Sequence, residues 1–173
     1  MKIKSARREF RIGQSSDVHR FEKGRKLVLG GVNIPFEYGL AGHSDADVVY
    51  HATAEAIIGA LGLGDMGTLF PDTDSKYLNI DSSYFIKKVY ETMKQNKYEI
   101  NNLDLEIHLE KPNLSQYKMY MRDNIAILLK TNVENINIKA TRGEGLGFIG
   151  RQEGIRCEAI VLLKSITDPI IKL

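Results

Sequence analysis

The sequence contains too little cysteine for an internal disulfide. Cys157 is the only cysteine among 173 residues, so it has no partner within the chain. A reducing compartment is therefore expected. Because Cys157 begins the largely apolar run 157–163, we expect a small buried hydrophobic residue rather than a reactive thiol.

Long apolar runs and an excess of one charge are also missing. No stretch approaches the roughly 20 apolar residues that span a bilayer, and the basic first residues lack the apolar segment of a secretory signal. The formal net charge is only +2, which provides no strong attraction to nucleic acid or to a membrane surface. We expect a protein that binds neither, located in a bacterial cytoplasm or a plastid-type organelle.

Apolar periodicity predicts helices and strands in mixed order. Strands are expected over 10–19, 103–109, 136–140 and 155–164, with a hairpin over 26–35 around Gly30-Gly31. Helices are expected over 44–61, 82–96 and 115–130. The order is typical of one α+β domain over 1–173, with an extension of 1–9 and a core of about 10–166. We expect a two-layer sandwich with one mixed β-sheet and helices on one face, whose uncovered face requires an oligomeric partner.

Three residues are candidate metal ligands. Asp17 and His19 are two apart on a predicted strand, so their side chains point the same way. His51, in a predicted helix, is the best candidate for a third ligand, and three such ligands leave the open fourth position of a catalytic zinc site. Asp47 and Glu55 form a polar stripe with His51, and a carboxylate one turn away could hold its second nitrogen. Ordinary hydrogen-bonded residues are the alternative.

Two further segments are candidates for binding anions. His43-Ser44 stands at the expected helix entrance, where Ser44 as N-cap and the free backbone N–H groups favour an anion; a purely structural cap is the alternative. Gly145-x-Gly147-x-x-Gly150 matches a dinucleotide fingerprint, but a strand is expected to follow, which excludes that interpretation. In the same loop, Arg142 suits phosphate oxygens and Glu144 suits Mg²⁺.

Taken together, these motifs resemble the 2-C-methyl-D-erythritol 2,4-cyclodiphosphate synthase family over nearly all of residues 11–164. The matching stretches include Asp17-Val18-His19, His43-Ser44-Asp45, His51-Ala52, Leu63-Gly64-Asp65, Leu69-Phe70-Pro71-Asp72-Thr73-Asp74, Lys139-Ala140-Thr141, Leu146-Gly147-Phe148 and Gly150-Arg151.

The resemblance implies an enzyme of the non-mevalonate isoprenoid pathway. It implies conversion of 4-diphosphocytidyl-2-C-methyl-D-erythritol 2-phosphate to the cyclic diphosphate and CMP, in a metal-assisted intramolecular attack of the 2-phosphate on the β-phosphorus. Such an enzyme is a phosphorus–oxygen lyase. The family forms a homotrimer with sheets facing a common axis and active sites between neighbouring subunits.

The resemblance also assigns residue roles. Zinc is expected on Asp17, His19 and His51, and Mg²⁺ or Mn²⁺ on Glu144. Contacts to the nucleotide substrate are expected from His43, Ser44, Asp65, Gly67, Phe70, Pro71, Asp72, Thr73, Asp74, Pro112, Leu114, Thr141 and Arg142. Phe148 and Arg151 match residues at the mouth of a cavity on the trimer axis, where isoprenoid diphosphates have been proposed to bind.

The chain departs from the family pattern at several positions. Gln14-Ser15-Ser16 replace His-Gly-Phe, Glu55 replaces an Asp, Asn113 replaces a Lys, and Arg142 stands in a run that is usually rich in Thr. Two other functions fit the same residues: a zinc phosphatase or cyclic phosphodiesterase that activates water, and a trimeric nucleotide-binding sensor without chemistry.

Overall fold

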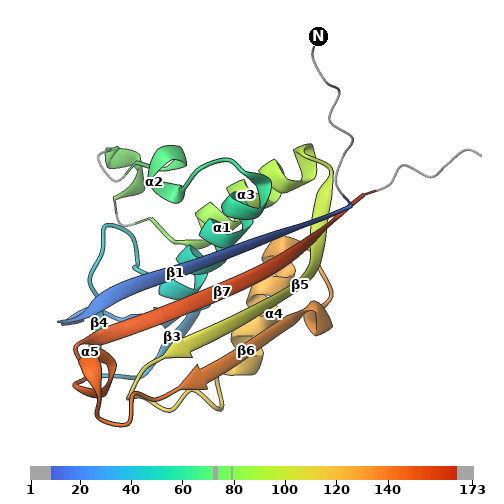
Figure 1. Ribbon diagram of the computed structural model, residues 1–173. Coiled ribbons are helices and arrows are strands. Elements are labelled where there is room, and N and C mark those ends of the chain that lie inside the picture. Colours follow the sequence, from blue (N-terminus) through green and yellow to red (C-terminus); the bar gives the residue numbers. More distant parts are fainter. Residues whose placement is uncertain (1–8, 72–73, 79, 167–173) are drawn as a thin grey trace, which may run out of the picture.

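The computed structural model describes residues 9–71, 74–78 and 80–166. Figure 1 shows how the elements are arranged. In chain order, the elements are β1 Phe10–Lys23, β2 Leu27–Leu29, β3 Val32–Ile34, β4 Tyr38–Leu40, α1 Val48–Leu61, α2 Met66–Leu69, η1 Ser75–Tyr77, α3 Ser83–Gln95, β5 Tyr98–His108, α4 Lys118–Leu129, η2 Val133–Asn135, β6 Ile136–Thr141, α5 Gly147–Gly150 and β7 Gly154–Ser165.

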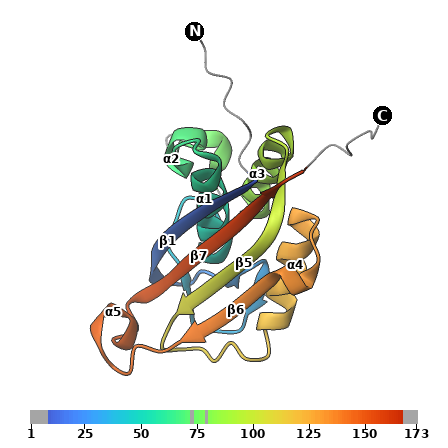
Figure 2. The same ribbon diagram turned by 45° about the vertical axis from the view of Figure 1, so that its right-hand side comes forward.

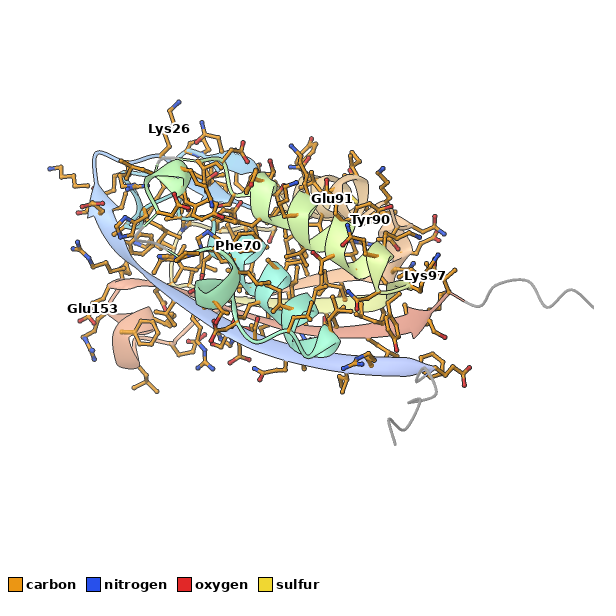
Figure 3. All side chains as sticks on the ribbon, turned by 90° about the horizontal axis from the view of Figure 1, so that it is seen from above. Lys26, Phe70, Tyr90, Glu91, Lys97 and Glu153 are labelled. Carbon is orange, nitrogen blue, oxygen red and sulfur yellow. The ribbon has the colours of Figure 1, made fainter. Side chains whose placement is uncertain are left out.

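The main sheet is mixed and is covered by helices on one face. Its strand order is β4-β1-β7-β5-β6; β5 and β6 are parallel, and the other neighbouring pairs are antiparallel. The longer helices α1, α3 and α4 lie behind the sheet in Figures 1 and 2, and Figure 3 shows the same one-sided arrangement from above. The predicted α+β class, with helices on one face of a mixed sheet, is confirmed. The hairpin predicted around Gly30-Gly31 is β2–β3.

Strand alternation divides the sheet into a buried and an open face. Leu105 and Ile107 of β5 and Ala159 of β7 are fully buried under the helices. On the opposite face, Ile12 is 70% exposed and Ile160 is 48% exposed. The open face therefore keeps apolar side chains in solvent, which is unfavourable unless another molecule covers them.

Helix α1 lies very close to β1. A Cβ atom on Gly13 would lie 2.0 Å from the Ala56 carbonyl oxygen, so only glycine allows this approach. The Ser15 hydroxyl donates a hydrogen bond to the Ala52 carbonyl at 2.6 Å. These contacts fix α1 over β1 and so place His51 above the strand that carries Asp17.

The start of α1 differs from the prediction. The helix begins at Val48 and not at Ser44, and its N-cap is Asp47, which accepts hydrogen bonds from the backbone N–H groups of Val49 and Tyr50. The predicted capping role of Ser44 is wrong, because the chain makes bends before Asp47 and Ala46 adopts a φ of 58°. The N-terminus of α1 is therefore at Asp47 and not beside Ser44.

The remaining helices agree with the expected ones apart from their ends. Helix α3 begins at Ser83 and α4 at Lys118, and the short elements β4 and α2 were not predicted. Across the described parts of the chain, no helix has both the length and the apolar character required to cross a bilayer.

Candidate metal centre

Asp17, His19 and His51 form a compact triad between β1 and α1. Asp17 Oδ2 lies 3.1 Å from His19 Nε2 and 3.2 Å from His51 Nδ1, and these two nitrogens are 3.1 Å apart. Three ligands of a tetrahedral zinc at about 2.0–2.1 Å would be separated by about 3.3 Å. The triad therefore has nearly the dimensions of three corners of a zinc tetrahedron.

The outer nitrogens of both imidazoles are hydrogen-bonded, which determines their tautomers. His19 Nδ1 donates to the Ala41 carbonyl oxygen at 2.8 Å, so the lone pair of a neutral His19 is on Nε2. The Ser82 hydroxyl donates to Asp45 Oδ1 at 2.5 Å and must accept from His51 Nε2, 2.9 Å away. The lone pair of a neutral His51 is then on Nδ1. Three acceptor atoms thus converge on one point, which requires a proton or a cation between them.

The charges in the triad are strongly coupled. Burial alone would raise the pKa of Asp17, but hydrogen bonds from His19 and His51 hold it well below its usual range. Burial alone would lower the pKa of His19, but the hydrogen bond and negative charge of Asp17 outweigh it and raise this pKa above its ordinary value. In the absence of a cation, a shared proton is therefore stabilised at the position where a metal ion would lie.

The predicted polar stripe on α1 has a different role. Asp47 is fully buried and accepts hydrogen bonds from the backbone N–H groups of Gly30 and Gly31, at 2.9 and 2.7 Å, as well as capping α1. Glu55 accepts from the Met66 backbone N–H at 2.8 Å. Neither carboxylate holds the second nitrogen of His51, so this expectation was wrong.

Ser82 and Asp45 hold His51 instead, and the sequence did not identify them as site residues. Ser44 Oγ is a further neighbour, 3.2 Å from both His51 Nε2 and Ser82 Oγ. Ser82 lies 31 positions from His51 in the sequence, and no local pattern connects the two. Asp45 carried a weak signal, because it follows His43-Ser44 directly.

The metal triad opens into a cavity of about 300 Å³. Its lining includes Ser16, Asp17, His19, His51, Glu55 and Met66. Phe70 packs against Phe85, with ring centroids 5.1 Å apart, and Phe85 in turn contacts His51.

Other predicted substrate contacts have definite places. Asp65 caps α2 through a hydrogen bond from the Thr68 backbone N–H at 2.7 Å. Asp74 pairs with Lys76 at 2.6 Å. His43, Gly67 and Pro71 are exposed, and Asp72 and Thr73 lie outside the described residues.

A second cavity lies at the far edge of the sheet. It has a volume of about 410 Å³, and its lining includes Pro112, Leu114, Thr141 and Arg142. The structure thus brings these four predicted contacts together, although none of them lines the cavity at the metal triad. The Thr141 hydroxyl donates to Glu106 at 2.7 Å.

Glu144 is not part of the metal triad of the same chain. Its side chain is 76% exposed and pairs with Arg142 at 3.4 Å. Phe148 and Arg151 lie in or beside α5, where Phe148 is half-buried and Arg151 pairs with Glu153 at 2.8 Å. Figure 3 shows Glu153 at this end of the molecule.

The chain is similar to known proteins over most of its length. The sequence profile of the YgbB family matches residues 10–164. A 2-C-methyl-D-erythritol 2,4-cyclodiphosphate synthase of Carboxydothermus hydrogenoformans is 51% identical over 158 residues, covering 91% of this chain and 97% of that protein. The synthase of a Geobacillus species is 52% identical over 155 residues, covering 90% and 98%.

Solved structures show the same fold. The CDP complex of Plasmodium falciparum IspF superposes with a TM-score of 0.82 at 32% identity, covering 94% of this chain and 100% of that one. The bifunctional IspDF of Campylobacter jejuni gives a TM-score of 0.87 at 43% identity over 91% of this chain, which spans only 42% of that longer protein.

Proposed function

Because this chain belongs to the YgbB family, the 2-C-methyl-D-erythritol 2,4-cyclodiphosphate synthases of the non-mevalonate pathway, we propose how its own residues carry out the reaction. The proposed substrate is 4-diphosphocytidyl-2-C-methyl-D-erythritol 2-phosphate. An oxygen of its 2-phosphate forms a bond to the β-phosphorus, and the bond from that phosphorus to the bridging oxygen breaks. CMP leaves with the electron pair, so the enzyme is a lyase that needs no protein nucleophile.

The observation that carries this proposal is the convergence of three acceptor atoms in the triad. Asp17 Oδ2, His19 Nε2 and His51 Nδ1 lie 3.1–3.2 Å apart, with the outer nitrogens engaged elsewhere. Imidazole and carboxylate ligands of this number and spacing fit zinc. When bound there, the ion supplies Lewis acidity towards a phosphate oxygen.

The chain's other residues are proposed to bind and orient the substrate. His43, Ser44 and the segment 70–74 hold the erythritol unit folded, so that the 2-phosphate lies near the β-phosphorus. Good alignment of such an intramolecular reaction can be worth roughly 7–11 kcal/mol of barrier. Asp65 and Gly67 are assigned to the ribose, and the cavity at Pro112 and Leu114 to the cytosine.

Glu144 is proposed to hold a second divalent cation, Mg²⁺ or Mn²⁺. Mg²⁺ commonly uses one or two carboxylates and completes its shell with phosphate oxygens and water, and Glu144 offers one exposed carboxylate. Its partner Arg142 is then released, and its guanidinium is free to meet phosphate oxygens.

The separation of the two cavities supports the proposed trimer. The metal triad and the cavity at Pro112 share no lining residue, yet one substrate molecule must reach both. A second copy can supply the missing half if the open sheet faces, with Ile12 and Ile160, meet around a common axis. Phe148 and Arg151 are proposed to lie at the mouth of the axial cavity.

The remaining expectations are kept as proposals. We propose one domain with its catalytic core at about 10–166, which is supported by a single hydrophobic cluster that extends from Leu27 to Leu163. A reducing compartment, either a bacterial cytoplasm or a plastid-type organelle, suits the buried free thiol of Cys157.

Phosphorus NMR of the purified protein with the diphosphocytidyl substrate and Mg²⁺ tests the proposal. We expect a cyclic diphosphate and CMP, both lost after treatment with a zinc chelator and restored by zinc. The His51→Ala variant should give neither product. Release of inorganic phosphate would support a hydrolase instead, and binding of unchanged substrate would support a sensor. Turnover that persists without bound metal would contradict the zinc assignment.

A further inference from the structure

We propose an additional metal site, distinct from the triad and from the site proposed at Glu144, that is formed by Glu106, His108 and Glu158 on the open face of the sheet and binds a zinc-class divalent cation. One ligand atom from each of these residues lies within 4.8 Å of the other two. The site is separate from the triad of Asp17, and it does not depend on the proposed reaction.

Strand alternation places the three side chains on the open face. Leu105 and Ile107 of β5 are fully buried beneath the helices, so Glu106 and His108 point to the other side. Glu158 of β7 lies between the buried Cys157 and Ala159 in the same way. In Figures 1 and 2 these strands lie in front of the helices, with no element of the described chain over them.

The strand register brings two carboxylates directly opposite each other. Glu106 and Glu158 are Cα partners in the antiparallel pairing of β5 and β7. Like charges at directly opposed positions destabilise a sheet. A cation between them would remove this repulsion.

Neighbouring cations neutralise these carboxylates only in part. Arg156 pairs with Glu158. Lys139 lies 2.7 Å from Asp104 but 3.7 Å from Glu106. Lys139 and Arg156 thus face the three carboxylates of residues 104, 106 and 158, and Glu106 also accepts a hydrogen bond from the Thr141 hydroxyl at 2.7 Å.

His108 provides the observation that points to a ligand. Within the described residues, its Nε2 atom is buried and has no hydrogen-bond partner. Glu158 Oε2 lies 3.8 Å from this nitrogen, which is too far for a hydrogen bond. A small movement of the two side chains towards each other would allow both atoms to bind the same ion. An imidazole nitrogen with two carboxylate oxygens is a donor set that zinc-class metals accept.

The new site repeats the spacing of the first one on the opposite side of the sheet. Asp17-x-His19 and Glu106-x-His108 each place a carboxylate and an imidazole on the same face of one strand. Asp17 is the Cα partner of Cys157, and the buried Cys157 side chain points towards the helices. Asp17 therefore lies on the helix-covered face of the sheet, whereas Glu158, the next residue after Cys157, points to the open face. The backbone of the sheet separates the two sites, so each should bind its metal independently.

Metal stoichiometry of the full chain tests this proposal. In a Glu144→Gln background, which removes the cation site proposed at Glu144, elemental analysis after dialysis against zinc should find two equivalents per chain, and one when His108→Ala is added. Glu158→Gln keeps the side-chain shape and should also bind one, so a folding defect in a single variant cannot explain the loss. Glu99→Gln is the matched control, because Glu99 lies on β5 with Glu106 and His108 but pairs with Lys164 at 3.4 Å. This variant should retain two zinc equivalents.

Cobalt binding tests whether the additional metal ion is held by His108. In a His51→Ala background the first site is weakened, and the d–d absorption of one tightly bound Co²⁺ should remain. Adding His108→Ala should weaken Co²⁺ binding by more than roughly 100-fold, which exceeds the usual effect of changing a residue that only supports a metal ligand. One zinc equivalent in the Glu144→Gln protein, or Co²⁺ absorption unchanged by His108→Ala, would overturn the proposal.

Discussion

Removing the Ser82 hydroxyl should weaken metal binding at the triad without unfolding the protein. The hydroxyl links His51 Nε2, at 2.9 Å, to Asp45 Oδ1, at 2.5 Å. It thereby holds the proton on Nε2 and the lone pair on Nδ1, which faces Asp17. In Ser82→Ala the imidazole loses this acceptor, and the tautomer with the proton on Nδ1 becomes accessible.

The remaining contacts of His51 determine the magnitude. Loss of a partner that orients a metal-binding imidazole typically lowers affinity about 10–100-fold, equivalent to about 1.4–2.8 kcal/mol. Ser44 Oγ remains 3.2 Å from Nε2, so Ser82→Ala should lie near the lower value, about 10-fold. The double variant Ser44→Ala/Ser82→Ala should approach about 100-fold.

The assay is zinc affinity measured by competition with a chromogenic chelator at pH 7.5. Ser83→Ala is the matched control, because it removes the neighbouring hydroxyl at the start of α3 and should change affinity less than twofold. Circular dichroism should show all variants folded. If Ser82→Ala binds zinc as tightly as Ser83→Ala, the hydroxyl does not orient His51 and the tautomer argument fails.

Three other predictions concern stability, pH and turnover. Asp47→Ala removes a helix cap and leaves the buried N–H of Gly30 without an acceptor, so urea unfolding should show a loss of about 2–5 kcal/mol; the exposed Asp123→Ala is the control, and an equal effect would contradict the capping role. The raised pKa of His19 means that protons compete with zinc from above the ordinary pKa of 6.5 downwards, so chelator competition should show affinity falling as pH is lowered through that range, and a flat profile between pH 8 and 6 would refute it. Glu144→Gln should lower turnover at least tenfold and leave the thermal midpoint nearly unchanged, since the Arg142 pair is exposed and such pairs contribute little to stability; rescue by excess Mn²⁺ would support a metal-binding role, whereas normal turnover would exclude it.

Local periodicity made much of the fold predictable. Alternation in β5 and β6, and apolar spacing in α1 and α3, depend on neighbouring residues alone, so the sequence indicated these elements to within a few positions. The start of α1 was missed because Ser44 and Asp47 are both good capping residues. The choice between them depends on the β2–β3 hairpin, whose N–H groups bind Asp47.

The sequence by itself indicated the three candidate metal ligands. Asp17 and His19 share a face because successive strand residues alternate, and their types favour zinc. The tertiary structure decided how these residues are held. Gly13 lets α1 approach β1 closely enough to bring His51 to the triad, and Ser82 reaches His51 from another helix. It also decided that Glu106 lies opposite Glu158, because strand register depends on core packing between segments about 50 residues apart in sequence.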